Sequence, residues 1–160
     1  MTTSRTQLAD VHVTTVGVFV LVGDGSLAVM RRDFWNPDAA TPQMRGSTIK
    51  GLVADGRAIE WTTVLDGTFL LRFFIGGEET SPTPDQVTGR LRLPTGELYV
   101  RSGDHVDPLR VCTLPTGIYD VALEWIVEQE ARHYDIAHPE LYPLDEGPDG
   151  LLTLWRRTSL

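Results

Sequence analysis

Four Asp-Gly dipeptides divide this chain into short apolar runs; they lie at residues 24–25, 55–56, 66–67 and 149–150. Tight β-hairpin turns require positive backbone φ angles, which glycine adopts without a Cβ clash and aspartate tolerates through local hydrogen bonding. The runs on either side are rich in Val, Ile, Leu and Phe, which are common strand residues. We therefore predict an all-β fold, an antiparallel β-sandwich of about 8–10 strands with hairpin and meander connections.

Several runs have the length and pattern of individual strands. Residues 12–22 are apolar on both parities from Val16 onward, which predicts one strand buried on both faces. The runs 49–54, 57–65 and 68–75 are joined by Asp-Gly pairs and predict an antiparallel meander. The third of them is the most apolar, so we expect it to lie centrally in a sheet. Residues 151–157 are expected to close the sheet as a final strand.

The second half of the chain contains one tetrapeptide twice, Leu93-Pro-Thr-Gly96 and Leu114-Pro-Thr-Gly117. Two copies are too few for a solenoid, so we interpret them as two similar turns that each enter a strand. After the second copy, large apolar residues alternate with polar ones through about residue 127. This period of two predicts a strand with one core face and one acidic face. A short helix after residue 127 remains an alternative, because good helix formers follow.

Length and composition indicate one domain. The chain has 160 residues, of which 41% are apolar, enough for a single core. We expect one β-sandwich domain over 1–160, with an irregular insertion at 31–46 and an acidic loop at 128–148. No apolar run reaches the length of a membrane span, and the single cysteine rules out an internal disulfide. These features favour a cytoplasmic protein.

The formal net charge is −8 and its distribution is uneven. Residues 97–150 hold 12 Asp or Glu and 3 Arg, a net charge of −9, whereas the other residues hold 10 acidic and 11 basic side chains, a net charge of +1. A negative field repels nucleic-acid phosphates and anionic lipids and favours a basic protein surface. We therefore expect a basic protein partner, with no direct nucleic-acid binding and no membrane binding. The alternative is that the charge only maintains solubility.

Catalytic and metal-binding patterns are weak. The residues His133, Asp135, His138 and Glu140 have suitable types for a transition metal, but the spacing of the first three matches no strong metal motif. Cys112 could act as a nucleophile with His105 and Asp107; the simpler interpretation is a small buried residue inside a strand. We therefore predict no enzyme activity, no cofactor and no metal site.

The order of segments resembles a known family. The segments that carry the resemblance are 12–22, 57–63, 68–74, 87–101 and, above all, 114–125, which begins Leu-Pro-Thr-Gly-Ile-Tyr. They resemble the competence protein J family of bacterial proteins. The resemblance implies a small β-domain that binds and silences a nuclease, because inhibition of a DNA-entry nuclease inside the cell is the function associated with that family. It implies no catalytic residues.

Charge and resemblance lead to the same functional prediction. We predict a non-enzymatic inhibitor or immunity protein that binds a basic partner such as a DNA nuclease, its carboxylates occupying the surface that would otherwise bind DNA phosphates. The alternative is a β-sandwich or barrel module for small-molecule binding or structural self-assembly, with no nuclease partner. The expected partner contacts come from the two irregular segments and from the acidic strand face, and they are Asp33, Trp35, Asp38, Asp120, Glu124, Glu128, Glu130 and Asp135.

Overall fold

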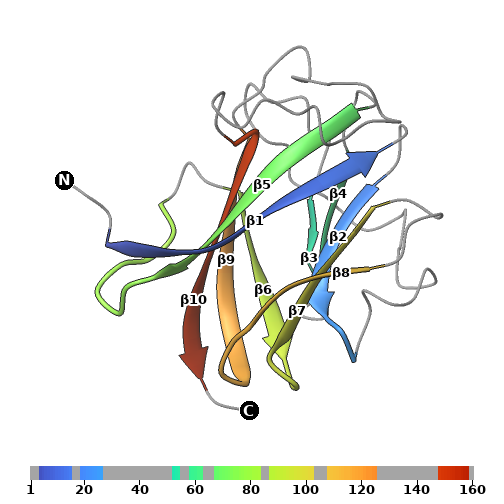
Figure 1. Cartoon of the computed structure of the whole chain (residues 1–160). Helices are drawn as coiled ribbons and strands as arrows, with labels where there is room; N and C mark the ends of the chain where they lie inside the picture. Colours follow the sequence, from blue (N-terminus) through green and yellow to red (C-terminus); the bar gives the residue numbers. More distant parts are fainter. Residues whose placement is uncertain are drawn as a thin grey trace.

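The computed structural model of this chain describes residues 4–15, 19–26, 52–54, 58–62, 67–83, 87–102, 108–125 and 148–158. These residues form ten strands and no helix. The strands are β1 (Arg5–Thr15), β2 (Phe19–Asp24), β3 (Leu52–Ala54), β4 (Ala58–Thr62), β5 (Gly67–Gly76), β6 (Val87–Leu93), β7 (Glu97–Ser102), β8 (Leu109–Thr113), β9 (Gly117–Trp125) and β10 (Gly150–Thr158) (Figure 1). No described segment is a helix long and apolar enough to cross a membrane.

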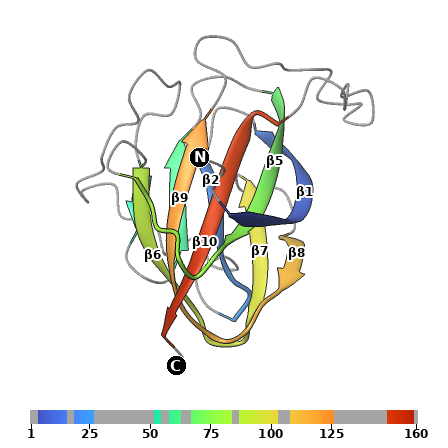
Figure 2. The same ribbon diagram turned by 90° about the vertical axis from the view of Figure 1, so that its left-hand side faces the viewer.

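Two five-stranded sheets form the sandwich. Sheet A has the order β1-β5-β10-β9-β6, and sheet B has the order β3-β4-β2-β7-β8. Figure 2 looks onto sheet A, with β10 at its centre and β2 and β7 behind it. The predicted all-β sandwich is therefore confirmed. The alternative helix after residue 127, the insertion at 31–46 and most of the loop at 128–148 lie outside the described residues.

The core lies between the two sheets and follows the period of two that the sequence predicted. On β9, Tyr119, Val121 and Leu123 are buried, whereas Asp120 and Glu124 on the other parity are partly exposed. The facing strand β7 contributes Leu98, which is fully buried. Full burial of each such side chain stabilises the fold by about 1.5–3 kcal/mol. The amphipathic alternation along β9 is thus the physical origin of its inner and outer faces.

Three local predictions about strand connections were wrong. Residues 12–22 do not form one strand, because β1 ends in sheet A and β2 begins in sheet B. The meander breaks after β4, since β4 lies in sheet B and β5 in sheet A. The last strand does not close a sheet edge but lies between β5 and β9. Strand-forming residues on both sides of a connection do not reveal whether it is a hairpin or a crossing between sheets.

One strand pair departs from the antiparallel pattern. β10 runs parallel to β5 from Gly150 to Leu154 and antiparallel to β9. The fully buried Asp149 starts this parallel pairing: its carboxylate accepts a hydrogen bond from the Leu70 N–H at 2.8 Å, and its own N–H donates to the Leu70 carbonyl at 2.9 Å. A long connection precedes β10, so no hairpin constrains its direction.

The two Leu-Pro-Thr-Gly segments are both turns, and they carry the chain between the sheets in opposite directions. The first joins β6 in sheet A to β7 in sheet B, and the second joins β8 in sheet B to β9 in sheet A. They lie in contact, because the Leu114 N–H donates to the Gly96 carbonyl at 2.8 Å. Gly96 has a φ of +76°. The repeat therefore forms one end of the sandwich.

The fully buried Asp24 fastens the first of these turns to the end of β2. Its carboxylate accepts hydrogen bonds from the Ser26 N–H at 2.8 Å, the Thr95 N–H at 2.9 Å and the Gly96 N–H at 3.2 Å. The hydroxyls of Ser26 and Thr95 also bond to it. Neither Gly25 nor Gly150 has a positive φ, so the positive-φ explanation is wrong for these two Asp-Gly pairs. Both aspartates instead bond to distant segments.

Tyr119 is the tyrosine of the Leu-Pro-Thr-Gly-Ile-Tyr motif, and its contacts explain why a tyrosine suits this position. Its ring is buried in the core, and its hydroxyl donates to the Pro115 carbonyl at 2.6 Å. The bond closes the second turn onto the first residues of β9. Burial raises the pKa of the Tyr119 hydroxyl, while the charge of Arg156 acts in the opposite direction.

We expect Tyr119→Phe to reduce the free energy of unfolding by about 1 kcal/mol, because it removes this hydrogen bond and keeps the ring. Urea denaturation followed by circular dichroism would measure the loss. The matched control is Tyr99→Phe, since the Tyr99 hydroxyl makes no hydrogen bond to the described residues. Equal losses in the two variants would show that the bond to Pro115 does not stabilise the turn.

Candidate partner-binding surface

The outer face of sheet A carries both described members of the predicted contact set. Asp120 and Glu124 lie on the same face of β9, separated along the strand by Ala122. Across the sheet, Asp120 faces Arg90 on β6 and Trp155 on β10. The remaining predicted contacts, Asp33, Trp35, Asp38, Glu128, Glu130 and Asp135, lie outside the described residues. The grouping of all eight residues therefore stays a prediction.

Asp120 does not present a lone carboxylate. Its oxygens lie 2.7 Å from Arg157 Nε and 3.7 Å from Arg90 Nε. The register between β10 and β9 shifts between Arg156 and Thr158, so Arg157 is the extra residue of a β-bulge. Ion pairs this exposed contribute little stability, but they reduce the negative potential at Asp120. Sequence position alone could not reveal these cross-strand arginines.

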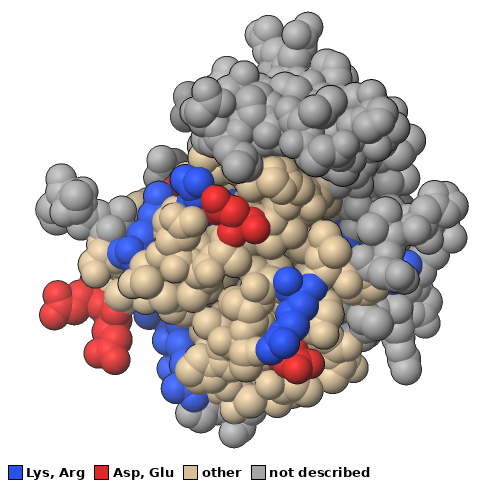
Figure 3. Space-filling view, viewed as in Figure 1, with Lys and Arg blue, Asp and Glu red and all other residues tan. Residues whose placement is uncertain are grey.

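A second ion pair lies at the other side of the same face. Arg72 on β5 donates to both carboxylate oxygens of Asp10 on β1, at 2.8 and 2.9 Å. Nearby, Arg5 stacks its guanidinium 4.0 Å from the centre of the Phe74 ring and donates to the Thr153 hydroxyl at 3.4 Å. Figure 3 accordingly shows acidic and basic side chains intermixed on the visible surface.

The net charge divides unequally between the described residues and the rest of the chain. The described residues hold 9 Asp or Glu and 8 Arg, a net charge of −1. The other residues hold 13 acidic and 6 basic side chains, which gives the remaining −7 of the total −8. Two of the described acids, Asp24 and Asp149, are buried. The acidic character predicted for a partner-binding surface therefore resides mainly outside the described strands.

The described residues give no support to a thiol nucleophile. Cys112 lies half-buried on β8, and burial raises its pKa although the charge of Arg110 acts in the opposite direction. A raised pKa keeps the thiol protonated at neutral pH, which lowers its nucleophilicity. His105 and Asp107 lie outside the described residues, as do His133, Asp135 and His138. Within the described part, no three His, Cys, Asp or Glu side chains gather in a metal-binding group.

Comparison with known proteins found similar solved structures but no match to a family model or to a curated sequence. Among solved structures, crocagin biosynthetic gene J superposes with a TM-score of 0.66 and 25% identity, over 96% of this chain and 99% of that one. ComJ of Bacillus subtilis, an inhibitor of the DNA-degrading activity of NucA, superposes with a TM-score of 0.55 and 13% identity over the same shares. The fold is ComJ-like. The likeness to these two structures spans nearly the whole chain.

Proposed function

We propose that this protein is a non-enzymatic, cytoplasmic binding protein that blocks a basic protein partner, such as a DNA nuclease, through an acidic surface. The observation that carries the proposal is the ComJ-like fold over 96% of the chain, since ComJ inhibits the DNA-degrading activity of NucA. The charge distribution is a second, independent support. A nuclease binds DNA phosphates through Arg and Lys, so carboxylates can compete for the same surface.

The ion pairs of Asp120 reduce the share that we expect it to have in the proposed acidic surface. Asp120 is held between two arginines, so it supplies less negative potential than its sequence context predicted. We therefore propose that Glu128, Glu130 and Asp135 contribute more of the negative potential than Asp120 does. Charged contacts at the rim of an interface accelerate association and make it sensitive to salt.

The test uses the purified full chain and the product of an adjacent nuclease gene. We expect a stoichiometric complex that blocks DNA cleavage and weakens strongly when the salt concentration rises, because screening shortens the range of exposed charges. The triple variant Glu128→Lys, Glu130→Lys and Asp135→Lys should bind more than about tenfold more weakly. Asp10→Lys is the control, since Asp10 is an exposed acid paired with Arg72 at another strand pair. If the nuclease cleaves DNA unchanged and no salt-sensitive complex forms, the proposal is wrong.

A second candidate function is favoured by the likeness to crocagin biosynthetic gene J, at 25% identity. In this second candidate, the protein is a β-sandwich module that binds a small molecule or assembles with itself and has no nuclease partner. This candidate predicts binding or association that changes little with salt, because apolar contacts are not screened. The salt titration above therefore distinguishes the two functions.

A further inference from the structure

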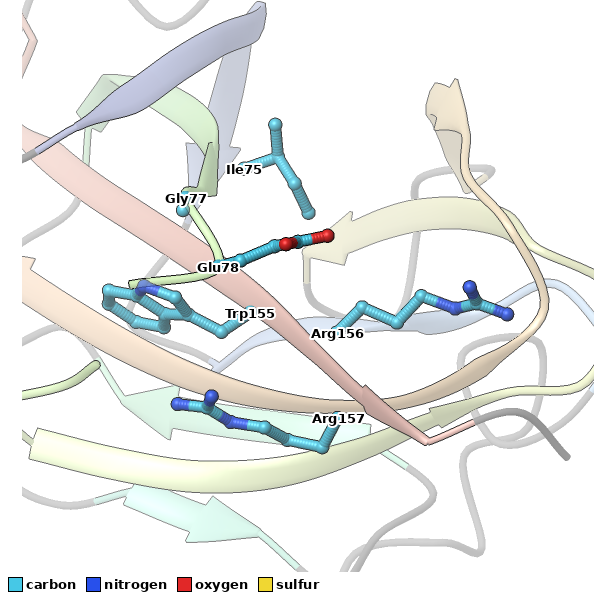
Figure 4. Close-up of a pocket in the computed structure, with 7 residues that line it drawn as sticks. Ile75, Gly77, Glu78, Trp155, Arg156 and Arg157 are labelled. Carbon is cyan, nitrogen blue, oxygen red and sulfur yellow. The ribbon is translucent and has the colours of Figure 1, made fainter. Parts of the chain in front are cut away.

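A notch opens at the end of sheet A where β5 leaves β10. The parallel pairing of the two strands stops at Leu154 and Ile75, whereas β10 continues beside β9 as far as Thr158. The last residues of β10 therefore have a paired strand on one side only. A pocket of about 320 Å³ fills this position. We call it the β10 notch; Ile75, Gly77, Glu78, Trp155, Arg156 and Arg157 line it (Figure 4).

The walls of the β10 notch are fixed by contacts that restrain the segment after β5. The Trp155 indole lies directly on Gly76, because a Cβ added at Gly76 would lie 2.0 Å from Trp155 Nε1. The Trp155 Nε1–H donates to the Thr80 hydroxyl at 2.8 Å, and that hydroxyl donates to the Gly77 carbonyl at 2.8 Å. The segment carrying Glu78 is thus anchored at both ends. A preformed wall lowers the entropic cost of binding a ligand.

The charged groups at the β10 notch are also held in place. Arg157 uses its Nε to bond Asp120 at 2.7 Å, and Arg156 donates from a terminal nitrogen to the Thr116 carbonyl at 2.9 Å. A guanidinium has five N–H donors, so each of these bonds uses one of several. Figure 4 shows the Glu78 carboxylate between Ile75 and Arg156, with Trp155 and Arg157 on the other side of β10. One cation, one carboxylate and one apolar side chain, those of Arg156, Glu78 and Ile75, therefore lie on the same side of β10.

We propose that the β10 notch binds a small organic acid that has an apolar body and an amino group, as in an apolar α-amino acid. The carboxylate of the ligand pairs with Arg156, its ammonium pairs with Glu78, and its apolar body lies against Ile75. The volume of about 320 Å³ is at the lower end of the range of about 300–1,000 Å³ for ligand pockets, which suits a small ligand. A guanidinium can hold a carboxylate by two parallel N–H···O bonds, so the carboxylate of the ligand is the main attachment. The inference does not depend on a nuclease partner.

Three matched probes separate these roles: L-phenylalanine, 3-phenylpropionate, which lacks the ammonium, and phenethylamine, which lacks the carboxylate. We expect saturable binding by calorimetry, strongest for phenylalanine, weaker for phenylpropionate and weakest for phenethylamine. The indole N–H resonance of Trp155, assigned with Trp155→Phe, should shift on titration. We take a dissociation constant of about 10 mM as the weakest that indicates a specific site. If none of the three probes binds at that concentration, the proposal is overturned.

Substitutions locate the binding within the β10 notch. Arg156→Gln should weaken phenylpropionate binding by at least about tenfold, because it removes the charge-assisted hydrogen bonds to the carboxylate. Glu78→Gln should weaken the binding of phenylalanine and leave the binding of phenylpropionate unchanged. Arg90→Gln is the control, since Arg90 is an exposed arginine on the same sheet that does not line the notch. A loss of binding in Arg90→Gln equal to that in the notch variants would show nonspecific attraction and overturn the assignment.

Discussion

Replacing Gly96 by alanine should destabilise this protein by about 4 kcal/mol or more, the range in which steric conflict and backbone strain combine. A Cβ at Gly96 would lie 2.0 Å from the Leu114 carbonyl oxygen, and the residue has a φ of +76°. The neighbour is backbone of the other Leu-Pro-Thr-Gly turn, so it cannot rotate away as a side chain could. The two turns would have to separate, which would break the Leu114 N–H bond to Gly96.

Two further variants distinguish the contact from the backbone angle. Asparagine adopts positive φ at lower cost than alanine but carries the same Cβ, so Gly96→Asn should be nearly as destabilising as Gly96→Ala. Gly77→Ala, whose nearest contact is Ser4 Oγ at 3.1 Å, should lose only about 1 kcal/mol. Urea unfolding of the three variants at one temperature gives the comparison. Near-native stability of Gly96→Asn would mean that the close approach of the turns is not what requires glycine.

Replacing Asp24 by asparagine should reduce the free energy of unfolding by about 3 kcal/mol, as expected when a buried charged acceptor loses its hydrogen bonds. Both carboxylate oxygens accept bonds from N–H and hydroxyl donors of Ser26, Thr95 and Gly96. An amide turns one acceptor into a donor that faces other donors. Asp10→Asn is the control, because Asp10 is exposed and its carboxylate binds the side chains of Arg72 and Gln7 at the surface; its loss should stay below about 1 kcal/mol.

The Asp24 contribution should also depend on pH in a defined direction. Burial acts to raise its pKa, but the hydrogen bonds from Ser26 and Thr95 outweigh burial and hold the pKa below the ordinary value of 3.8. The folded state therefore binds this proton less readily than the unfolded state. The stabilisation is complete above pH 3.8 and is lost as the pH falls below it through the folded-state pKa. The stability difference between wild type and Asp24→Asn should accordingly shrink in that acidic range, and a difference that grew there would contradict the assignment.

The all-β class and the inner and outer faces of the strands were predictable from local pattern. Tyr119, Val121 and Leu123 alternate with polar residues, and a period of two can bury one face only as a strand. The same local information was insufficient for the connections. An Asp-Gly pair between two apolar runs is compatible with a hairpin and equally with a crossing between sheets. The connection from β4 to β5 is such a crossing, because the two strands lie in different sheets.

The candidate sites also combine features that the sequence predicted with features that depend on the pairing of distant strands. The uneven charge of the chain was visible as composition, and it remains the basis of the proposed acidic surface. The neutralisation of Asp120 was not visible, because Arg90 and Arg157 come from strands that are distant in sequence and adjacent only in the sheet. The β10 notch likewise depends on where β5 ends beside β10. No pattern around Glu78 or Arg156 indicates that these residues share a pocket.

The sequence alone determined that this protein is built of strands with one apolar face, because alternation and turn residues act over a few neighbouring positions. The tertiary structure decided what the Asp-Gly pairs do. Asp24 and Asp149 are buried and bond to Thr95 and Leu70, more than 70 residues away in each case. Their roles as anchors arise from pairing between distant segments, since a buried carboxylate must find donors wherever the fold places them.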